Sequence, residues 1–306
     1  MTILDTTERH RNIDSPNPLD WISPAPAAAA TIGEPAKARS YAIRIQPGLV
    51  LAYIILAIAL LWAVAPGLFT SYDPVQGLPG QQLKAPSTLH LLGTDSLGRD
   101  LYTRLVYGAV HSLSGAIAAV AIGLFVGTTL GVIAGSVGGW IDEVIMRLVD
   151  VLLSIPVLLL SLSIIILLGF GTVNAAIAVG FTSIASFARL VRSEVVSVRR
   201  SEYVEAAFGS GGTFFKVLWR HVLPNSLTSV IAFTALQVGS AILQISTLGF
   251  LGYGAPPPTP EWGLLIAEGR NYIATAWWLT AAPGIVVVLV VLSVNRVSQA
   301  IGRAQQ

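Results

Sequence analysis

The stretch that decides the fold is Glu202 to Asn225, "EYVEAAFGSGGTFFKVLWRHVLPN", a polar interruption in a chain made largely of long apolar runs. Its first part predicts a short helix, because acidic, small and apolar residues recur there at helical spacing. Such a helix exposes the carboxylates of Glu202 and Glu205 and presents the small side chains of Ala206 and Ala207. Small side chains let the surface of a partner protein come close.

A turn and a second helix are expected next. The glycines at positions 209, 211 and 212 permit backbone angles that end the first helix. Pro224 then predicts the entry into a membrane segment, with Asn225 and Ser226 as its caps. The apolar residues between turn and proline fit one helical face that can lie along the membrane interface: Phe214, Phe215, Leu218, Trp219 and Val222.

Composition indicates a membrane protein. Of the 306 residues, 54% are hydrophobic and 11% are charged, whereas about 25% are charged in ordinary soluble domains. A bilayer core is crossed by about 20 apolar helical residues, and several stretches reach that length. A formal charge of +2 without a dense Lys/Arg run argues against nucleic acid as a partner. The absence of cysteine excludes disulfides and thiolate chemistry.

Six apolar segments predict an all-α membrane protein with six transmembrane helices. They lie at about 48–69, 112–135, 147–169, 173–190, 226–249 and 277–296. Only "GFGTV" separates the third segment from the fourth, which predicts a tight helical hairpin. Cytoplasmic loops carry an excess of Lys and Arg, and fourteen of the 18 such residues lie on one side if both termini are inside. The topology is therefore predicted to be N-in and C-in, with the opening stretch in the cytoplasm.

The ends of the chain differ from the rest. Residues 1–46 contain the proline-rich "SPNPLDWISPAPAAAA" and no periodic apolar face. Because proline fixes φ and donates no N–H, we expect a mostly disordered cytoplasmic tail. Residues 47–300 are the predicted membrane domain, and 301–306 a short cytoplasmic C-terminus.

Glycines recur every fourth residue in the second segment and just beyond it. They form a strip without side chains along one helix face, which another helix can approach closely. We expect this strip to pack within the chain, and a subunit contact or a lining of a transport path are the alternatives. The strip consists of Gly123, Gly127, Gly131, Gly135 and Gly139.

Charged residues mark the cytoplasmic start of the third segment, "IDEVIMRLVD". Glu143 and Arg147 are spaced i, i+4, and Arg147 and Asp150 are spaced i, i+3, a spacing that permits both pairs to form near the interface. Pro156 removes a backbone hydrogen bond further along the segment, which predicts a kink.

The outer loop after the first segment holds a polar group of residues. Thr94 and Asp95 are candidates to cap a short helix. Arg99 and Asp100 are candidates to pair with each other or to contact a docking protein. Gly93 and Gly98 complete the group.

A second outer loop, "GYGAPPPTPEWG", is rich in proline and glycine, which predicts ordered, non-helical structure. Tryptophans often mark the interface between membrane and water. We expect that position for Trp262, Trp277 and Trp278.

Several kinds of chemistry are missing. The four histidines, at 10, 90, 111 and 221, form no HxxxH or HExxH pair, which argues against a zinc site. No lysine follows a glycine, so the phosphate loop GxxxxGK[ST] that binds ATP is absent. The apolar segments carry essentially no ionisable group away from their ends, unlike ion-coupled transporters. We expect no catalytic site, cofactor or metal on this chain, and a partner that supplies the energy.

The opening stretch resembles the EAA loop of bacterial ABC importer permeases, whose pattern is Glu-Ala-Ala, three residues, Gly, and later a hydrophobic residue and Leu-Pro. Glu205, Ala206, Ala207, Gly211 and Pro224 fall in register with it. "LLGTDSLGRDLYTRLVYGAVHSL", "GGWIDEVIMRLVDVLLSIP" and "LGFLGYGAPPPTPEWG" are similar to segments of the C-type subunit in the dipeptide/oligopeptide (and nickel) permease family. The resemblance extends over roughly residues 48 to 300.

The resemblance implies a type I importer fold with a cytoplasmic coupling helix, in a loop at about 198–224, that docks into an ATPase subunit. It assigns this contact to Glu202, Tyr203, Glu205, Ala206, Ala207, Gly211 and Pro224. It implies import of peptides across the bacterial cytoplasmic membrane. The implied partners are a second homologous permease in a heterodimer, two ATPase subunits or domains that bind ATP and Mg, and an extracytoplasmic solute-binding protein.

Three alternatives stay open from the sequence. Nickel or another small solute is carried by some members of the family that the chain resembles. A stand-alone secondary transporter or channel would move solute without an ATPase. An intramembrane enzyme would need a nucleophile and a base that converge, and the sequence offers no such pair.

Overall fold

A computed structural model describes residues 46–304, which contain ten α-helices, short 3₁₀ and π turns, and no strand. The predicted disordered tail lies outside the described residues except for Gln46, and so do residues 305–306. The prediction of an all-α protein is confirmed.

Five helices are long and apolar enough to cross a membrane, and a bent pair provides a sixth span if it is counted as one. The six-helix prediction is thereby confirmed. The five are α1 (Pro47–Val64), α2 (Leu101–Val137), α5 (Thr172–Arg199), α8 (Leu223–Phe250) with the helical turns from Phe214 before it, and α10 (Trp278–Ala304). The bent pair is α3 (Gly139–Ser154) and α4 (Val157–Leu168).

The predicted kink at Pro156 is a full change of direction. The sequence predicts one helix over 147–169, but α3 and α4 meet at 95°. The ring of a proline disfavours helical angles at the residue before it, and Ile155 is extended, with φ −88° and ψ 130°. The first helix therefore ends at Ser154, and the second begins after the proline.

The helix α2 starts earlier than expected. The apolar run begins near residue 112, whereas α2 begins at Leu101. The carboxylate of Asp100 accepts a hydrogen bond from the backbone N–H of Thr103 at 2.8 Å and so caps the helix. The added turns carry the charged Arg104, so a search for continuous apolar segments does not include them.

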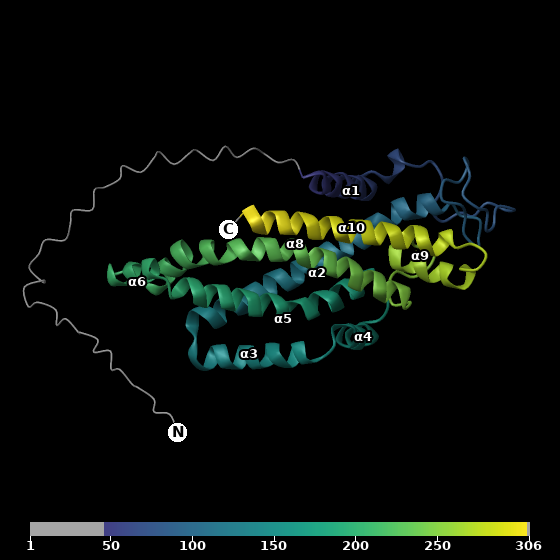
Figure 1. Cartoon of the computed structure of the whole chain (residues 1–306). Coiled ribbons are helices and arrows are strands. Elements are labelled where there is room, and N and C mark those ends of the chain that lie inside the picture. Colours follow the sequence, from purple (N-terminus) through teal and green to yellow (C-terminus); the bar gives the residue numbers. More distant parts are fainter. Residues whose placement is uncertain (1–45, 305–306) are drawn as a thin grey trace, which may run out of the picture. The chain divides into compact units, whose positions relative to one another are not determined.

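The long helices pack side by side (Figure 1). α5 lies against α2 over most of its length, α8 packs on both, and α10 packs between α8 and α1. The Arg296 guanidinium donates to the Gln46 side chain at 2.9 Å, so the start of α1 and the last turns of α10 lie at the same end of the bundle. α6 (Glu202–Gly209) lies toward that end too, as an N-in, C-in topology requires.

The opposite end carries the outer elements. They are η1 (Pro66–Leu68), the loop from 69 to 100, α9 (Trp262–Gly269) and η3 (Arg270–Tyr272). The predicted ATPase-contact residues of α6 and the polar residues of the outer loop therefore lie at opposite ends of the bundle.

Candidate functional site

The cytoplasmic stretch is a short helix joined closely to a long one. α5 ends at Arg199, and α6 begins at Glu202. The carbonyl of the intervening Ser201 accepts hydrogen bonds from the N–H groups of Val204 at 3.0 Å and Glu205 at 3.1 Å. The junction is therefore a hydrogen-bonded turn rather than a long loop.

α6 turns its acidic residues toward solvent. The side chains of Glu202, Tyr203, Glu205 and Ala206 are exposed, and Ala207 is half-buried. Val204 is fully buried in the core and anchors the helix. The residues to which the resemblance assigns the ATPase contact are accessible to a partner protein.

Gly211 makes the turn that follows α6. Its φ is +86°, a left-handed angle that side chains disfavour. Its N–H donates to the carbonyl of Phe208 at 2.9 Å, and the N–H of Gly212 donates to the carbonyl of Ala207 at 3.1 Å. These bonds satisfy carbonyls at the end of α6.

The capping expectation for the fifth span is wrong. α7 (Phe214–Val217), the π turn η2 (Leu218–Val222) and α8 form one helical stretch, Phe214–Phe250, with Pro224 inside it. The Asn225 amide donates to the carbonyl of His221 at 2.7 Å, and the Ser226 hydroxyl to that of Leu223 at 3.2 Å. Because the backbone stays helical through the π turn, there is no free helix end at Pro224 to cap.

The single apolar face expected before Pro224 is also wrong. Phe215 and Trp219 are 71% and 70% exposed, whereas Val222 is buried in the core. A π turn contains more residues than an α turn, so it rotates the side chains that follow out of line with those before it.

Four of the five strip glycines lie against α5. A Cβ atom added to any of them would come within about 3 Å of α5 atoms, closer than real Cβ atoms approach. The nearest backbone oxygens are those of Ile184 for Gly127, at 2.6 Å, and of Ala188 for Gly131, at 2.7 Å. Gly123 and Gly135 are equally close to α5, whereas Gly139 has φ +59° and no neighbour within 4 Å. Four glycines of the strip pack within the chain, whereas Gly139 is the first residue of α3, directly after the turn at Gly138.

The charged residues of α3 pair with α5 and not with one another. The Nε of Arg192 donates to Asp142 at 3.0 Å, and Arg189 pairs with Asp150. The predicted pairs of Arg147 with Glu143 and Asp150 do not form in the part of the chain that the structure describes. An arginine fork on a facing helix can meet a carboxylate with two hydrogen bonds, and Arg192 does so with both oxygens of Asp142.

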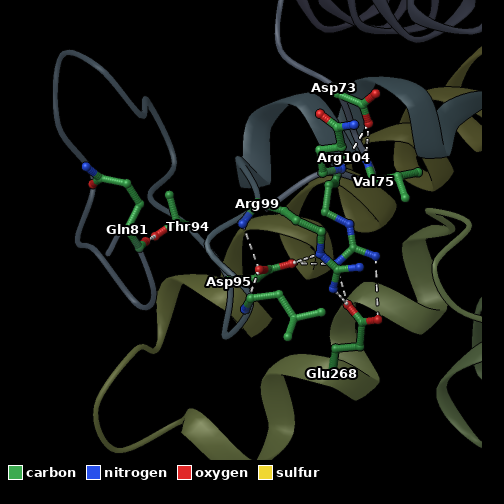
Figure 2. A network of polar contacts seen from close by, with 10 residues as sticks. Asp73, Val75, Gln81, Thr94, Asp95, Arg99, Arg104 and Glu268 are labelled. Carbon is green, nitrogen blue, oxygen red and sulfur yellow. Dashed lines mark hydrogen bonds and ion pairs between the residues drawn. The ribbon is translucent and has the colours of Figure 1, made fainter. Parts of the chain in front are cut away.

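A buried ionic network ties the outer loop to α9, as Figure 2 shows. The Asp95 carboxylate accepts hydrogen bonds from Arg99 Nε at 2.6 Å and Arg104 Nη1 at 2.8 Å. Arg104 also pairs with Glu268 near the end of α9, and Arg99 Nη2 lies 3.4 Å from the same carboxylate. Both arginines are buried, and two carboxylates balance their charges, which is the condition for burying ions at moderate cost.

The predicted pair of Arg99 with Asp100 is wrong, since each of them has another partner. The Asp100 carboxylate lies 2.9 Å from His90 Nδ1 and caps α2. Adjacent residues point apart in the extended backbone before α2, and Asp100 has ψ 121°. Arg99 and Asp100 therefore serve two different buried contacts.

Thr94 and Asp95 hold the loop itself rather than cap a helix. The Thr94 hydroxyl donates to the carbonyl of Gln81 and accepts from the N–H of Lys84 at 2.9 Å. The Asp95 carboxylate accepts from the N–H groups of Leu97 and Arg99 at 2.8 and 3.0 Å. The two glycines of the group, Gly93 and Gly98, have φ near the left-handed region, at +79° and +77°.

Sequence reasoning missed Arg104 and Glu268, because no local spacing links residues 164 positions apart. It also missed Glu261, whose fully buried carboxylate caps α9 by accepting from the N–H groups of Gly263 and Leu264 at 3.0 and 3.3 Å. Burial raises the pKa of Glu261 to about 7, against the opposing effect of these two hydrogen bonds.

The tryptophans divide into two groups. Trp262 is fully buried, and its Nε1 donates to the carbonyl of Leu105 at 3.0 Å. Trp278 is also buried, whereas Trp277 is 62% exposed. Trp262 and Trp278 therefore pack inside the protein, and of the three tryptophans only Trp277 presents its ring to the surroundings.

Within residues 46–304, no three His, Asp or Glu side chains lie close enough to hold a metal ion.

Comparison with known proteins identifies the family. Residues 127–305 match the model of the family described as "Binding-protein-dependent transport system inner membrane component". The chain is 38% identical over 291 residues to the dipeptide transport system permease protein DppC of Alkalihalophilus pseudofirmus, covering 95% of each chain. It is 40% identical over 212 residues to the glutathione transport system permease protein GsiD of Pectobacterium atrosepticum, covering 69% of this chain and 70% of the other.

A solved structure has the same fold. A chain in an inward-facing structure of the MetNI methionine ABC transporter matches with a TM-score of 0.56 at 17% identity, over 66% of this chain and 96% of that one. The sequence matches and the match in helical fold each cover more than half of the chain. The chain therefore belongs to the family of inner membrane components of binding-protein-dependent transport systems.

Proposed function

We propose that the chain is the permease subunit of an ATP-driven importer that carries peptides into the cell. The observation that supports this substrate class is the similarity over 95% of both chains to a dipeptide permease. The glutathione permease is a second relative whose named solute is a short peptide. The nickel or small-solute alternative becomes an outcome of the test below.

The exposed side of α6 is the proposed contact for a cytoplasmic ATPase subunit. Glu202, Tyr203 and Glu205 offer polar contacts, and Ala206 and Ala207 allow close approach. Gly211 shapes the turn, and Pro224 lies where the stretch enters α8. Because α6 is joined to α5 and α8 without a long loop, a displacement of α6 moves both helices.

The proposed assembly contains a second, homologous permease, two ATPase subunits that bind ATP and Mg, and a solute-binding protein at the outer loops. This chain contributes no catalytic site and binds no cofactor. In the outer loop, the exposed Leu89, Leu91 and Leu97 are accessible to the binding protein, while the network of Asp95 and Arg99 keeps the loop rigid beneath them.

The function is tested by reconstituting the complex in liposomes with labelled di-, tri- and penta-alanine and with ⁶³Ni²⁺. ATP-dependent uptake of an alanine peptide supports the proposal, and uptake of nickel alone overturns the substrate class. Uptake by this chain without any ATPase supports a secondary transporter or channel. Glu205→Lys and Gly211→Pro should weaken ATPase binding while membrane insertion stays intact, and unchanged uptake and ATP hydrolysis in both variants contradict the assignment of α6.

A further inference from the structure

Two arginines of α5 hold the turn between α2 and α3. Arg199 Nη1 donates to the carbonyl of Ser136 at 2.7 Å, in the last turn of α2, where carbonyls lack partners within the helix. Arg192 binds both carboxylate oxygens of Asp142 in the first turn of α3. The two arginines are seven residues apart, so they project from the same side of α5.

The turn itself does not fix α3 relative to α2. It is made by Gly138 and by Gly139, the first residue of α3, with φ of +74° and +59°. Neither residue has a side chain to pack, and glycine is the residue with the widest choice of backbone angles. The position of α3 therefore depends on its contacts with α5 and with the rest of α2.

The packing along the glycine strip fixes α2 to α5 without help from the arginines. At Gly127 and Gly131 the side chains of Phe187 and Val191 occupy the space that a Cβ atom would take. Helices resist sliding when side-chain ridges of one enter grooves of the other. A displacement of α5 is therefore shared by α2, whereas α3 lies beyond the glycine turn.

The same end of α5 leads directly into α6. The N–H of Ser201 donates to the carbonyl of Val198 at 3.1 Å, and the Ser201 carbonyl accepts from Glu205 of α6 at 3.1 Å. A displacement of α6 thus reaches Arg199 within one turn of helix.

We propose that Arg192 and Arg199 are positioning residues that transmit a displacement of α6 to α3, so that α3 moves with α5 and α2 as one unit. This inference rests on the proposed function, in which an ATPase subunit moves α6. Without the two arginines, α3 follows α5 only in part, and ATP hydrolysis moves it less.

The test uses spin labels in the assembled complex with partner permease and ATPase subunits. The chain has no cysteine, so within this chain labels attach only at Trp140→Cys, exposed at the start of α3, and Gln299→Cys, exposed on α10, and the partner subunits are used in cysteine-free form. ATP is expected to shift the distance between the labels in the otherwise unmodified chain. Arg192→Gln combined with Arg199→Gln leaves only the exposed pair of Arg189 with Asp150 between α5 and α3, so it should reduce that shift by about half or more and lower the amount of peptide transported per ATP by about fivefold.

Two matched variants separate this role from a loss of folding. Arg147→Gln removes an arginine of α3 that forms no ion pair within residues 46–304, and it should retain the shift. Exchange of the charges, Asp142→Arg with Arg192→Asp, should restore the shift that Arg192→Asp alone reduces. A full ATP-dependent shift in the double glutamine variant overturns the inference.

Binding of the ATPase subunits, measured first by co-purification, separates the two proposals. If they do not bind the unmodified chain, the proposed function falls, and this inference falls with it. If they bind and ATP shifts the labels equally with and without the arginines, only the inference falls.

Discussion

Arg104, fully buried in the first turn of α2, pairs with Glu268 at the end of α9, 164 residues later in the chain. Asp95 of the outer loop binds the same guanidinium at 2.8 Å. One side chain thus joins three outer elements that the sequence separates widely. The outer face on which a binding protein would dock is held together by buried charge.

Removing this guanidinium should destabilise the protein. Arg104→Gln leaves Arg99 as the remaining guanidinium partner of both Asp95 and Glu268. We expect a loss of roughly 3 kcal/mol, at the low end for a broken buried ion pair because the Glu268 side chain is 25% exposed. The measurement is SDS-induced unfolding in mixed micelles.

Arg189→Gln is the matched control. It breaks a pair with Asp150 in which the side chains are 54% and 61% exposed, so the loss should lie below about 1 kcal/mol. Equal losses in the two variants would contradict a special role for the buried network.

The glycine strip should tolerate no side chain. In Gly131→Ala, the new methyl group would lie 2.7 Å from the carbonyl oxygen of Ala188, which must move away. Forcing such an atom into a close contact costs about 1–3 kcal/mol. Gly284→Ala in α10 is the control, because that position has no neighbour within 4 Å. The same unfolding assay should find it neutral or slightly stabilising, and equal effects would refute close packing of α2 on α5.

The sequence predicted the features that depend on local pattern. The lengths of the apolar runs predicted the spans, and the spacing of the strip glycines predicted a close helix contact. The "EAA" stretch predicted a short helix followed by a glycine turn. These features need no knowledge of which helix lies next to which.

The errors concern partners that only the fold brings together. Asp142 and Arg192 are 50 residues apart, so no local spacing predicts their pair. The sequence pointed instead to pairs of Arg147 with its neighbours within α3. Trp262 is of a residue type common at the interface, yet it is buried, and a carbonyl of α2 binds its indole N–H. At Pro156 the sequence located the break, but the 95° angle depends on how α4 packs against α5.

The turn after α6 should require glycine at position 211 because of its backbone angle. Gly211→Ala places a side chain at φ +86°, at a cost of roughly 1–2 kcal/mol. Amide hydrogen exchange in residues 202–212 should then accelerate about five- to thirtyfold. Gly209→Ala is the control, since Gly209 has ordinary helical angles and open space around it. Unchanged exchange in Gly211→Ala would indicate that the turn adapts.

Stability should depend on pH through Glu261. Burial raises the pKa of this carboxyl from 4.5 to about 7 in the folded protein. Between these values the folded state binds more protons than the unfolded state, so the stability contribution is present below about 4.5 and lost as the pH rises through about 7. The loss is on the order of 3 kcal/mol.

Glu261→Gln stays neutral at every pH, and its amide oxygen can still accept from the N–H of Gly263. Unfolding of both proteins in detergent across this range should therefore show the stability of the variant rising relative to the unmodified protein with pH, and then levelling off. Parallel curves would mean that folding does not raise the pKa of Glu261.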